Sequence, residues 1–255
     1  PISGYSYGTP KLDRHMLEYF TVERITEFIL RCERQGITTW QSNYNPRVRD
    51  GLRAARERGS RIQWILLTSE SQGNLQEAMA LKPIAVCHHG GVSDRLTRSG
   101  KQEAIHDFVK RVHDLGAMAG ISTHNPDFLA KFEDAGWEND FYMACFYYLT
   151  RTPEERRRIL SEDLWGPYIF VRSDPQRMAA RIREVSKPCL AYKILAAGHA
   201  CRDAAAVDRA FSFAFGNIKP TDGVIVGMYP VFTDEIGEDA ELTRKYGAPG
   251  RSPAT

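Results

Sequence analysis

Short apolar segments alternate with amphipathic helical segments along most of the chain, and this alternation constrains the fold more than any other feature. The apolar segments are rich in β-branched and aromatic residues, as in Ile62-Gln-Trp-Ile-Leu-Leu-Thr68, which is typical of strands. They begin near residues 37, 62, 84, 117, 141, 188 and 223. Strands that alternate strictly with helices predict a parallel sheet covered by helices.

The segments between the strands begin with recognisable helix signals. Thr152-Pro-Glu-Glu155 combines a cap residue, a proline and an acidic residue one turn later. Ser99 with Gln102 suggests a second capping box. Helices are predicted to begin at Thr21, Pro46, Leu75, Ser99, Asn125, Thr152, Asp174, Ala204 and Thr233. Residues 1–20 are turn-rich and aromatic, so an irregular loop is expected there.

The predicted fold class is α/β, and specifically a (β/α)8 TIM barrel. A length of 255 residues fits one such barrel. The rival open, doubly wound sheet usually carries a glycine-rich phosphate turn after its first strand, and this sequence has none. A single barrel domain is therefore expected over residues 1–246, followed by a flexible tail over 247–255. Because a barrel needs eight strands, the first strand either precedes Pro1 or is replaced by a segment within residues 1–8.

Composition restricts the class of partner. Lys and Arg number 34 against 32 Asp and Glu, which leaves no basic footprint for nucleic acid. Five cysteines stand at wide spacings without a C-x-x-C pair, as expected in a reducing compartment. No apolar stretch approaches the roughly 20 residues of a membrane span. We expect a cytoplasmic protein with a small-molecule substrate, and the oligomeric state is left open.

The stretch from Ile84 to Asp94 concentrates polar groups at the end of a buried strand. Two histidines, two glycines and an aspartate follow the apolar run, so a polar loop is expected. Barrel active sites lie at these strand ends. Alternation along a strand places His88 and His89 on opposite sides, and which one faces the barrel axis is left open. Either histidine could instead be structural, bonded to a backbone group.

Two other strand ends offer candidate groups. His124 is read either as a catalytic side chain or as part of a turn before a helix. Lys193 lies within an expected strand, where a charge is costly without a partner. It is a candidate Schiff-base lysine, a charge that orients an oxyanion, or an ion-pair partner of Asp94 or Glu70. Glu70, His89 and His124 are weak candidates for a divalent metal site, since no short-spaced metal motif supports them.

Four segments of the C-terminal half resemble the aldo-keto reductase superfamily. They are Gly120-Ile-Ser-Thr-His-Asn125, Tyr147-Tyr-Leu-Thr-Arg151, Ala191-Tyr-Lys-Ile-Leu-Ala-Ala-Gly198 and Val224-Ile-Val-Gly-Met228. This resemblance implies a barrel that uses NADP or NAD to act on a small carbonyl or carbohydrate-type metabolite. It implies cofactor contacts for Ser122, Tyr192, Gly227 and Met228, and departs from the family pattern at Thr123 and Tyr142.

The resemblance also implies catalytic positions in the N-terminal half. Tyr44 lies close to the family's catalytic tyrosine, and His88 or His89 matches its histidine. Gln41 stands where the family has an Asp, and Thr68 or Ser69 where it has a Lys. Two of the four catalytic roles are therefore changed, and a tyrosine without its lysine holds its proton tightly.

Three functions follow from these observations. The first is an aldo-keto-reductase-like oxidoreductase with an altered catalytic set, in which Tyr44 or Lys193 handles the proton. The second is a non-redox lyase, isomerase or hydrolase that works through the histidines, Glu70 and Lys193, with or without a divalent metal. The third is a catalytically inactive barrel, because a fold alone does not prove an activity.

Overall fold

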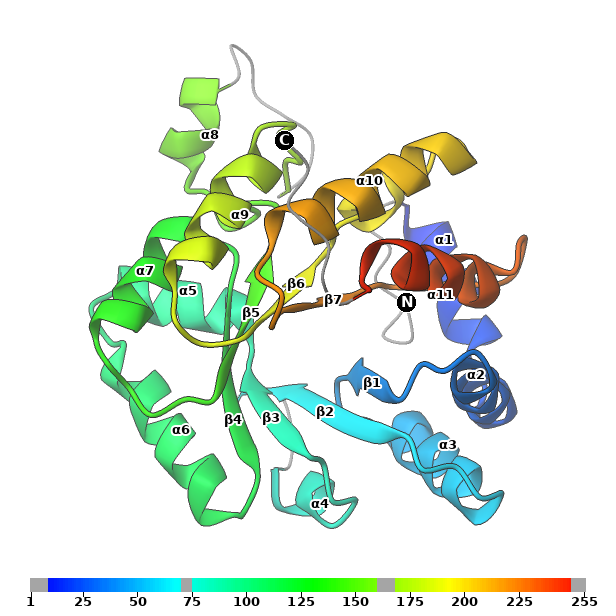
Figure 1. Ribbon diagram of the computed structural model, residues 1–255. Coiled ribbons are helices and arrows are strands. Elements are labelled where there is room, and N and C mark those ends of the chain that lie inside the picture. Colours follow the sequence, from blue (N-terminus) through cyan, green and yellow to red (C-terminus); the bar gives the residue numbers. More distant parts are fainter. Residues whose placement is uncertain (1–8, 70–74, 160–167, 249–255) are drawn as a thin grey trace.

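The computed structural model describes residues 9–69, 75–159 and 168–248 and contains a nearly closed parallel α/β barrel. Seven strands pair side by side in chain order, every pair parallel. They are β1 (Thr39–Ser42), β2 (Gln63–Thr68), β3 (Ala85–His88), β4 (Met118–Thr123), β5 (Phe141–Cys145), β6 (Cys189–Tyr192) and β7 (Gly223–Ile225). The helices surround these strands (Figure 1). A TIM-like barrel is thus confirmed, while residues 1–8, where we sought a further strand, lie outside the described residues.

The helices follow the predicted order. They are α1 (Pro10–Tyr19), α2 (Val22–Arg34), α3 (Pro46–Glu57), α4 (Leu75–Met79), α5 (Gly90–Arg98), α6 (Glu103–Asp114), α7 (Pro126–Asp134), α8 (Pro153–Ile159), α9 (Asp174–Glu184), α10 (Ala204–Asn217) and α11 (Glu235–Tyr246). The capping box of α8 is confirmed, because the Thr152 amide donates to Glu155 Oε2 at 2.6 Å and the Glu155 amide donates to Thr152 Oγ1 at 3.2 Å. None of the described helices is long and apolar enough to cross a membrane.

Four local predictions were wrong. Two expected loops are helices: α1, capped by Thr9, and α5, which begins directly after His89. The predicted capping box at Ser99 is absent, because the Ser99 hydroxyl donates to the Leu96 carbonyl and so serves the end of α5 instead. The last helix is preceded by Asp234 rather than Thr233.

The core has two layers. A large cluster fills the space between the strands and the helices, and it includes Trp64, Leu66 and Val86. A smaller cluster lies inside the barrel and is formed by Ile65, Ala85, Cys87, Phe141 and Met143. Alternate residues of β3 therefore face opposite layers, with Val86 toward the helices and Cys87 toward the barrel axis. This alternation determines where the polar groups after β3 point.

Candidate active site

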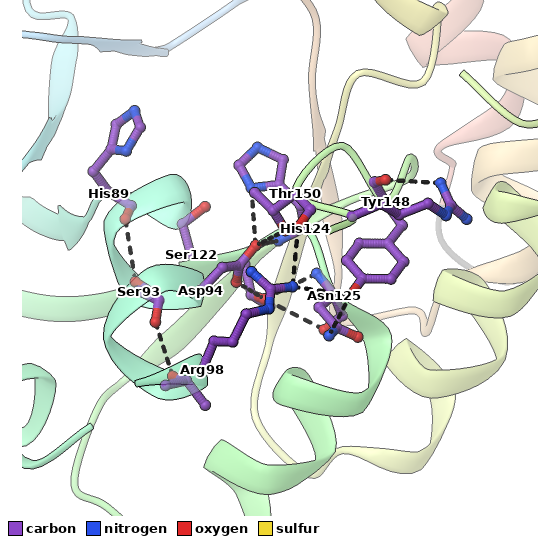
Figure 2. Close-up of polar contacts among 12 residues, drawn as sticks. His89, Ser93, Asp94, Arg98, Ser122, His124, Asn125, Tyr148 and Thr150 are labelled. Carbon is purple, nitrogen blue, oxygen red and sulfur yellow. Dashed lines mark hydrogen bonds and ion pairs between the residues drawn. The ribbon is translucent and has the colours of Figure 1, made fainter. Parts of the chain in front are cut away.

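Helix α5 carries a fully buried carboxylate, Asp94, to the C-terminal ends of β4 and β5. It accepts hydrogen bonds from Thr123 Oγ1 at 2.5 Å, from Thr150 Oγ1 at 2.6 Å and from the His124 amide at 3.0 Å. A fourth contact joins Asp94 Oδ2 to His124 Nδ1 at 3.3 Å. Burying a charge is costly unless it is hydrogen-bonded. The four donors make Asp94 a fixed acceptor beside the histidine (Figure 2).

The contacts continue from His124 to two hydroxyl groups. His124 Nε2 lies 3.1 Å from the Tyr192 hydroxyl, and Ser122 Oγ donates to that same hydroxyl at 3.1 Å. Because Asp94 can only accept, the hydrogen-bond network assigns the His124 proton to Nδ1 and leaves Nε2 as an acceptor for Tyr192. Asp94, His124, Tyr192 and Ser122 therefore form one hydrogen-bonded chain, which we call the Asp–His–Tyr–Ser chain.

Gly90, the first residue of α5, allows the helix to approach this chain closely. A Cβ atom at Gly90 would lie 2.8 Å from Ser122 Oγ, 3.0 Å from His124 Cε1 and 3.1 Å from the Tyr192 hydroxyl. Gly91 is less constrained, because its Cβ would meet the His89 ring at 3.4 Å, an ordinary contact. The first glycine is thus required by space at the site, and the second is not.

The loop after β5 is held against the site by Arg98 of α5. Its guanidinium donates to the Thr150 carbonyl at 2.9 Å and to the Tyr148 hydroxyl at 3.1 Å (Figure 2). The Tyr148 hydroxyl also donates to the Glu155 carboxylate, which caps α8. Thr150 in turn donates to Asp94. The start of α8 is thereby connected to the buried Asp94 carboxylate through hydrogen bonds.

The two adjacent histidines have different surroundings. His88 faces the helix layer: its Nδ1 lies 2.7 Å from Ser93 Oγ, and its ring packs on Phe108. The charges of His124, Lys193 and Asp94 act on His89, so this side chain lies on the side of the Asp–His–Tyr–Ser chain. Burial lowers the pKa of each histidine to about 4, which keeps both neutral at neutral pH.

The apolar neighbours of Lys193 predicted that it lies within a strand. This prediction was wrong, because β6 ends at Tyr192 and Lys193 is the next residue. Its backbone has φ 60°, in the left-handed region that non-glycine residues rarely adopt. The ammonium lies 5.8 Å from the centroid of the Tyr192 ring, and its charge acts on both His89 and Cys145. Burial lowers its pKa.

Tyr44 lies at a different part of the barrel mouth. The groups that act on its hydroxyl are Glu77 and Arg49, and burial together with Glu77 raises its pKa. It borders a cavity of about 600 Å³ lined by Leu17, Asn43, Tyr44, Asn45, Pro46, Arg47 and Leu67. The two alternative proton carriers, Tyr44 and Lys193, have different neighbours, because those of Lys193 include Tyr192, Cys145 and His89.

The other predicted ligands are only partly placed. Glu70 lies outside the described residues, and within the described ranges no group of three or more His, Cys, Asp and Glu side chains is arranged to hold a metal ion. Gly227 is exposed after β7, and Met228 packs on the main core. Ser122 and Tyr192, which the resemblance assigned to a nicotinamide, are in direct contact at 3.1 Å.

Sequence reasoning missed Thr123, Thr150 and Gly90 as parts of the site and gave Asp94 no definite role. A signal was present, because the buried residues of α5 are Gly90, Ser93, Asp94 and Thr97. Their spacing is helical, but they are polar or lack a side chain. A search for apolar periodicity therefore passes over them.

Comparisons with known proteins support the fold alone. No protein-family model and no curated protein matches the chain. Among solved structures, an apo form of a protein called Gox0644 is 12% identical, with 92% of this chain and 90% of that chain covered and a TM-score of 0.50. A probable 2-pyrone-4,6-dicarboxylic acid hydrolase from Acinetobacter baumannii, with citric acid bound, is 12% identical, with 89% and 81% covered and a TM-score of 0.46. The protein is thus a TIM-like α/β barrel with the Asp–His–Tyr–Ser chain at its strand ends.

Proposed function

We propose that this barrel is a non-redox enzyme, a hydrolase, lyase or isomerase, that moves protons on a small carbonyl or carbohydrate-type metabolite. The observation that carries the proposal is the Asp–His–Tyr–Ser chain at the C-terminal strand ends. Barrel enzymes place their reacting groups at that face. A histidine held by a buried carboxylate on one ring nitrogen is arranged for general acid–base catalysis through the other.

The chemistry follows from the acceptor at His124 Nε2. A substrate proton transferred to this nitrogen creates an imidazolium, which the Asp94 carboxylate stabilises through Nδ1. The Tyr192 hydroxyl, which accepts a hydrogen bond from Ser122, turns from His124 Nε2 to donate to a developing substrate oxygen, and this frees Nε2 to accept the substrate proton. General acid–base catalysis of this kind contributes about 10²–10⁴-fold to a rate.

The test is solvent-proton exchange and hydrolysis followed by NMR. A panel of reducing sugars, hydroxyketones and lactones is incubated in deuterated water with the wild type, His124→Gln and His113→Gln. His113 bonds to Asp140, which precedes β5 and so lies at the opposite end of the barrel. We expect the wild type and His113→Gln to act on the same compounds, and His124→Gln to lose about 10²-fold or more in rate. An inactive wild type, or equal rates for His124→Gln and the wild type, contradicts the proposal.

A nicotinamide-linked reductase is the second candidate, and it is favoured by the direct contact of Ser122 with Tyr192. In this alternative, the two residues would hold the nicotinamide, and a hydride from NADPH or NADH would reduce the carbonyl. Titration with either nucleotide separates the candidates, because a ligand that binds only the folded state raises its melting temperature. A shift with nucleotide together with carbonyl-dependent oxidation of NADPH favours the reductase.

A further inference from the structure

Lys193 has an energetically unfavourable backbone conformation, which persists only when the surrounding structure stabilises it. Besides Lys193, Ala196 and Ala197 also have positive φ angles, 51° and 53°, in the turn that follows β6. Non-glycine residues adopt this region at a conformational cost, and such residues cluster where a side chain must be aimed for function. The turn places the lysine next to Tyr192, whose hydroxyl belongs to the Asp–His–Tyr–Ser chain.

Burial favours the uncharged form of the Lys193 amine. Its neighbours include the Tyr192 ring, the Cys145 thiol and the His89 imidazole. Cys145 is buried and its pKa is raised to about 11, so it is neutral at neutral pH, as is His89. Burial in such surroundings lowers the pKa of Lys193 and increases the fraction of nucleophilic amine.

Lys187, just before β6, is an internal comparison. Burial also lowers its pKa, but its ammonium donates to the Trp137 carbonyl and, at 3.1 Å, to Asn139 Oδ1. The carboxylates of Glu133, Asp140 and Glu138 act in the opposite direction and favour its charged form. Two partly buried lysines therefore flank the same strand, one among carboxylates and carbonyls and the other beside the proposed acid–base groups.

We propose that Lys193 forms a covalent imine with an aldehyde or ketone substrate, which it holds against the Asp–His–Tyr–Ser chain. This inference rests on the acid–base function proposed above and narrows its substrate class to carbonyl compounds. The lysine is the catalytic nucleophile, and His124 and Tyr192 serve the proton transfers.

The bond changes balance without a further reactant. The Nζ lone pair of the neutral amine attacks the carbonyl carbon, and the oxygen takes a proton from the Tyr192 hydroxyl. The nitrogen then loses one proton, which returns to Tyr192 by way of His124. The carbon–oxygen bond breaks as water leaves with one more proton from solvent, and a protonated imine remains. That cationic imine draws electrons from the adjacent carbon, whose proton is thereby made acidic enough for a histidine base.

Borohydride trapping tests the proposal. The full-length protein is incubated with dihydroxyacetone, or with pyruvate as an anionic ketone, reduced with sodium borohydride and mapped by peptide mass spectrometry. A trapped imine adds the mass of the ketone plus two hydrogens less one water. We expect at least a tenfold higher occupancy at Lys193 than at Lys187 in the same sample. Equal occupancy at the two lysines, or no adduct at Lys193 with either ketone, overturns the proposal.

Two variants guard against a folding artefact. Lys193→Met keeps the unbranched apolar stem but has no amine, and Lys193→Gly suits the positive φ angle. Both should keep the melting temperature and lose the adduct. If the adduct is absent from the wild type while exchange still depends on His124, the imine is wrong and the acid–base function stands. If the adduct forms at Lys193 but His124→Gln leaves exchange unchanged, the imine stands and the acid–base function is wrong.

Discussion

Two buried aspartates show opposite ways of placing a carboxyl group inside this barrel. Asp94 is inaccessible to solvent and accepts four hydrogen bonds, from Thr123, Thr150 and two nitrogens of His124. Asp239 on α11 is also buried, yet the groups that act on it are the carboxylates of Glu235 and Glu238. Burial and these like charges raise the pKa of Asp239 to about 7.

Burial alone therefore does not identify a functional acid. The pKa of Asp239 is strongly perturbed, which taken by itself would mark it as a candidate site. The charges that act on Asp239 are like charges, whereas the donors around Asp94 orient its carboxylate and connect it to His124. The donors around a buried carboxylate are therefore a better guide to function here than the size of a pKa shift.

Removing the carboxylate of Asp94 should have the largest effect. In Asp94→Ala, two hydroxyls and a backbone amide lose a buried acceptor, and we expect a loss of about 3–5 kcal/mol in the free energy of unfolding. Activity should fall about 10²-fold or more, because His124 loses its orienting partner. Urea unfolding and the exchange assay measure both effects. Asp107→Ala, on the exposed face of α6, is the control, and a comparable loss there would contradict the assignment.

Removing the charge of Asp239 should stabilise the protein, but only at high pH. The folded pKa of about 7 lies above the ordinary aspartate value of 3.8, so the folded state holds its proton more tightly than the unfolded chain. The contribution of the protonated Asp239 to the free energy of unfolding is then fully present below pH 3.8 and is lost as the pH rises through 7. Asp239→Asn should therefore raise the unfolding free energy by about 3 kcal/mol at pH 8 and leave it nearly unchanged at pH 4. Glu241→Gln, exposed on the same helix, should change neither value.

The smallest effect is expected at the two glycines of α5. In Gly90→Ala, the new methyl group overlaps Ser122, His124 and Tyr192, and we expect a loss of about 1–3 kcal/mol together with reduced activity. Gly91→Ala should be neutral or stabilising, because its contact is ordinary and alanine favours a helix by up to about 1 kcal/mol. Thermal unfolding and the exchange assay compare the pair. Equal activities of the two variants would show that the chain tolerates displacement.

The sequence predicted the features of the barrel that depend on short-range chemistry. The capping box of Thr152 and Glu155 and the proline at the start of α7 involve residues within one helical turn, so their effect is local. The order of strands followed from apolar runs that are buried on both faces. These signals needed no knowledge of distant segments.

The site depended on contacts that no local pattern encodes. Asp94 meets Thr150 across 56 positions of the chain, and Ser122 meets Tyr192 across 70. His124 was singled out from the sequence, but its partners became visible only when α5 was placed against β4. The resemblance matches a catalytic tyrosine at Tyr44 but finds no lysine at the family's usual position. Lys193 does not take the place of that lysine beside Tyr44, because the two side chains have different neighbours.

The connection from α8 to Asp94 has a consequence for how this protein responds to heat. Glu155 caps α8, a helix with no buried residue in its described part, and is connected through Tyr148, Arg98 and Thr150 to the buried carboxylate. A helix that buries no side chain gains little stability from tertiary packing and opens before a folded core does. Warming would therefore open α8 first and remove the Glu155 contact of Tyr148, while the buried ion pair of Arg151 with Asp174 keeps the loop after β5 in place and the strands remain paired.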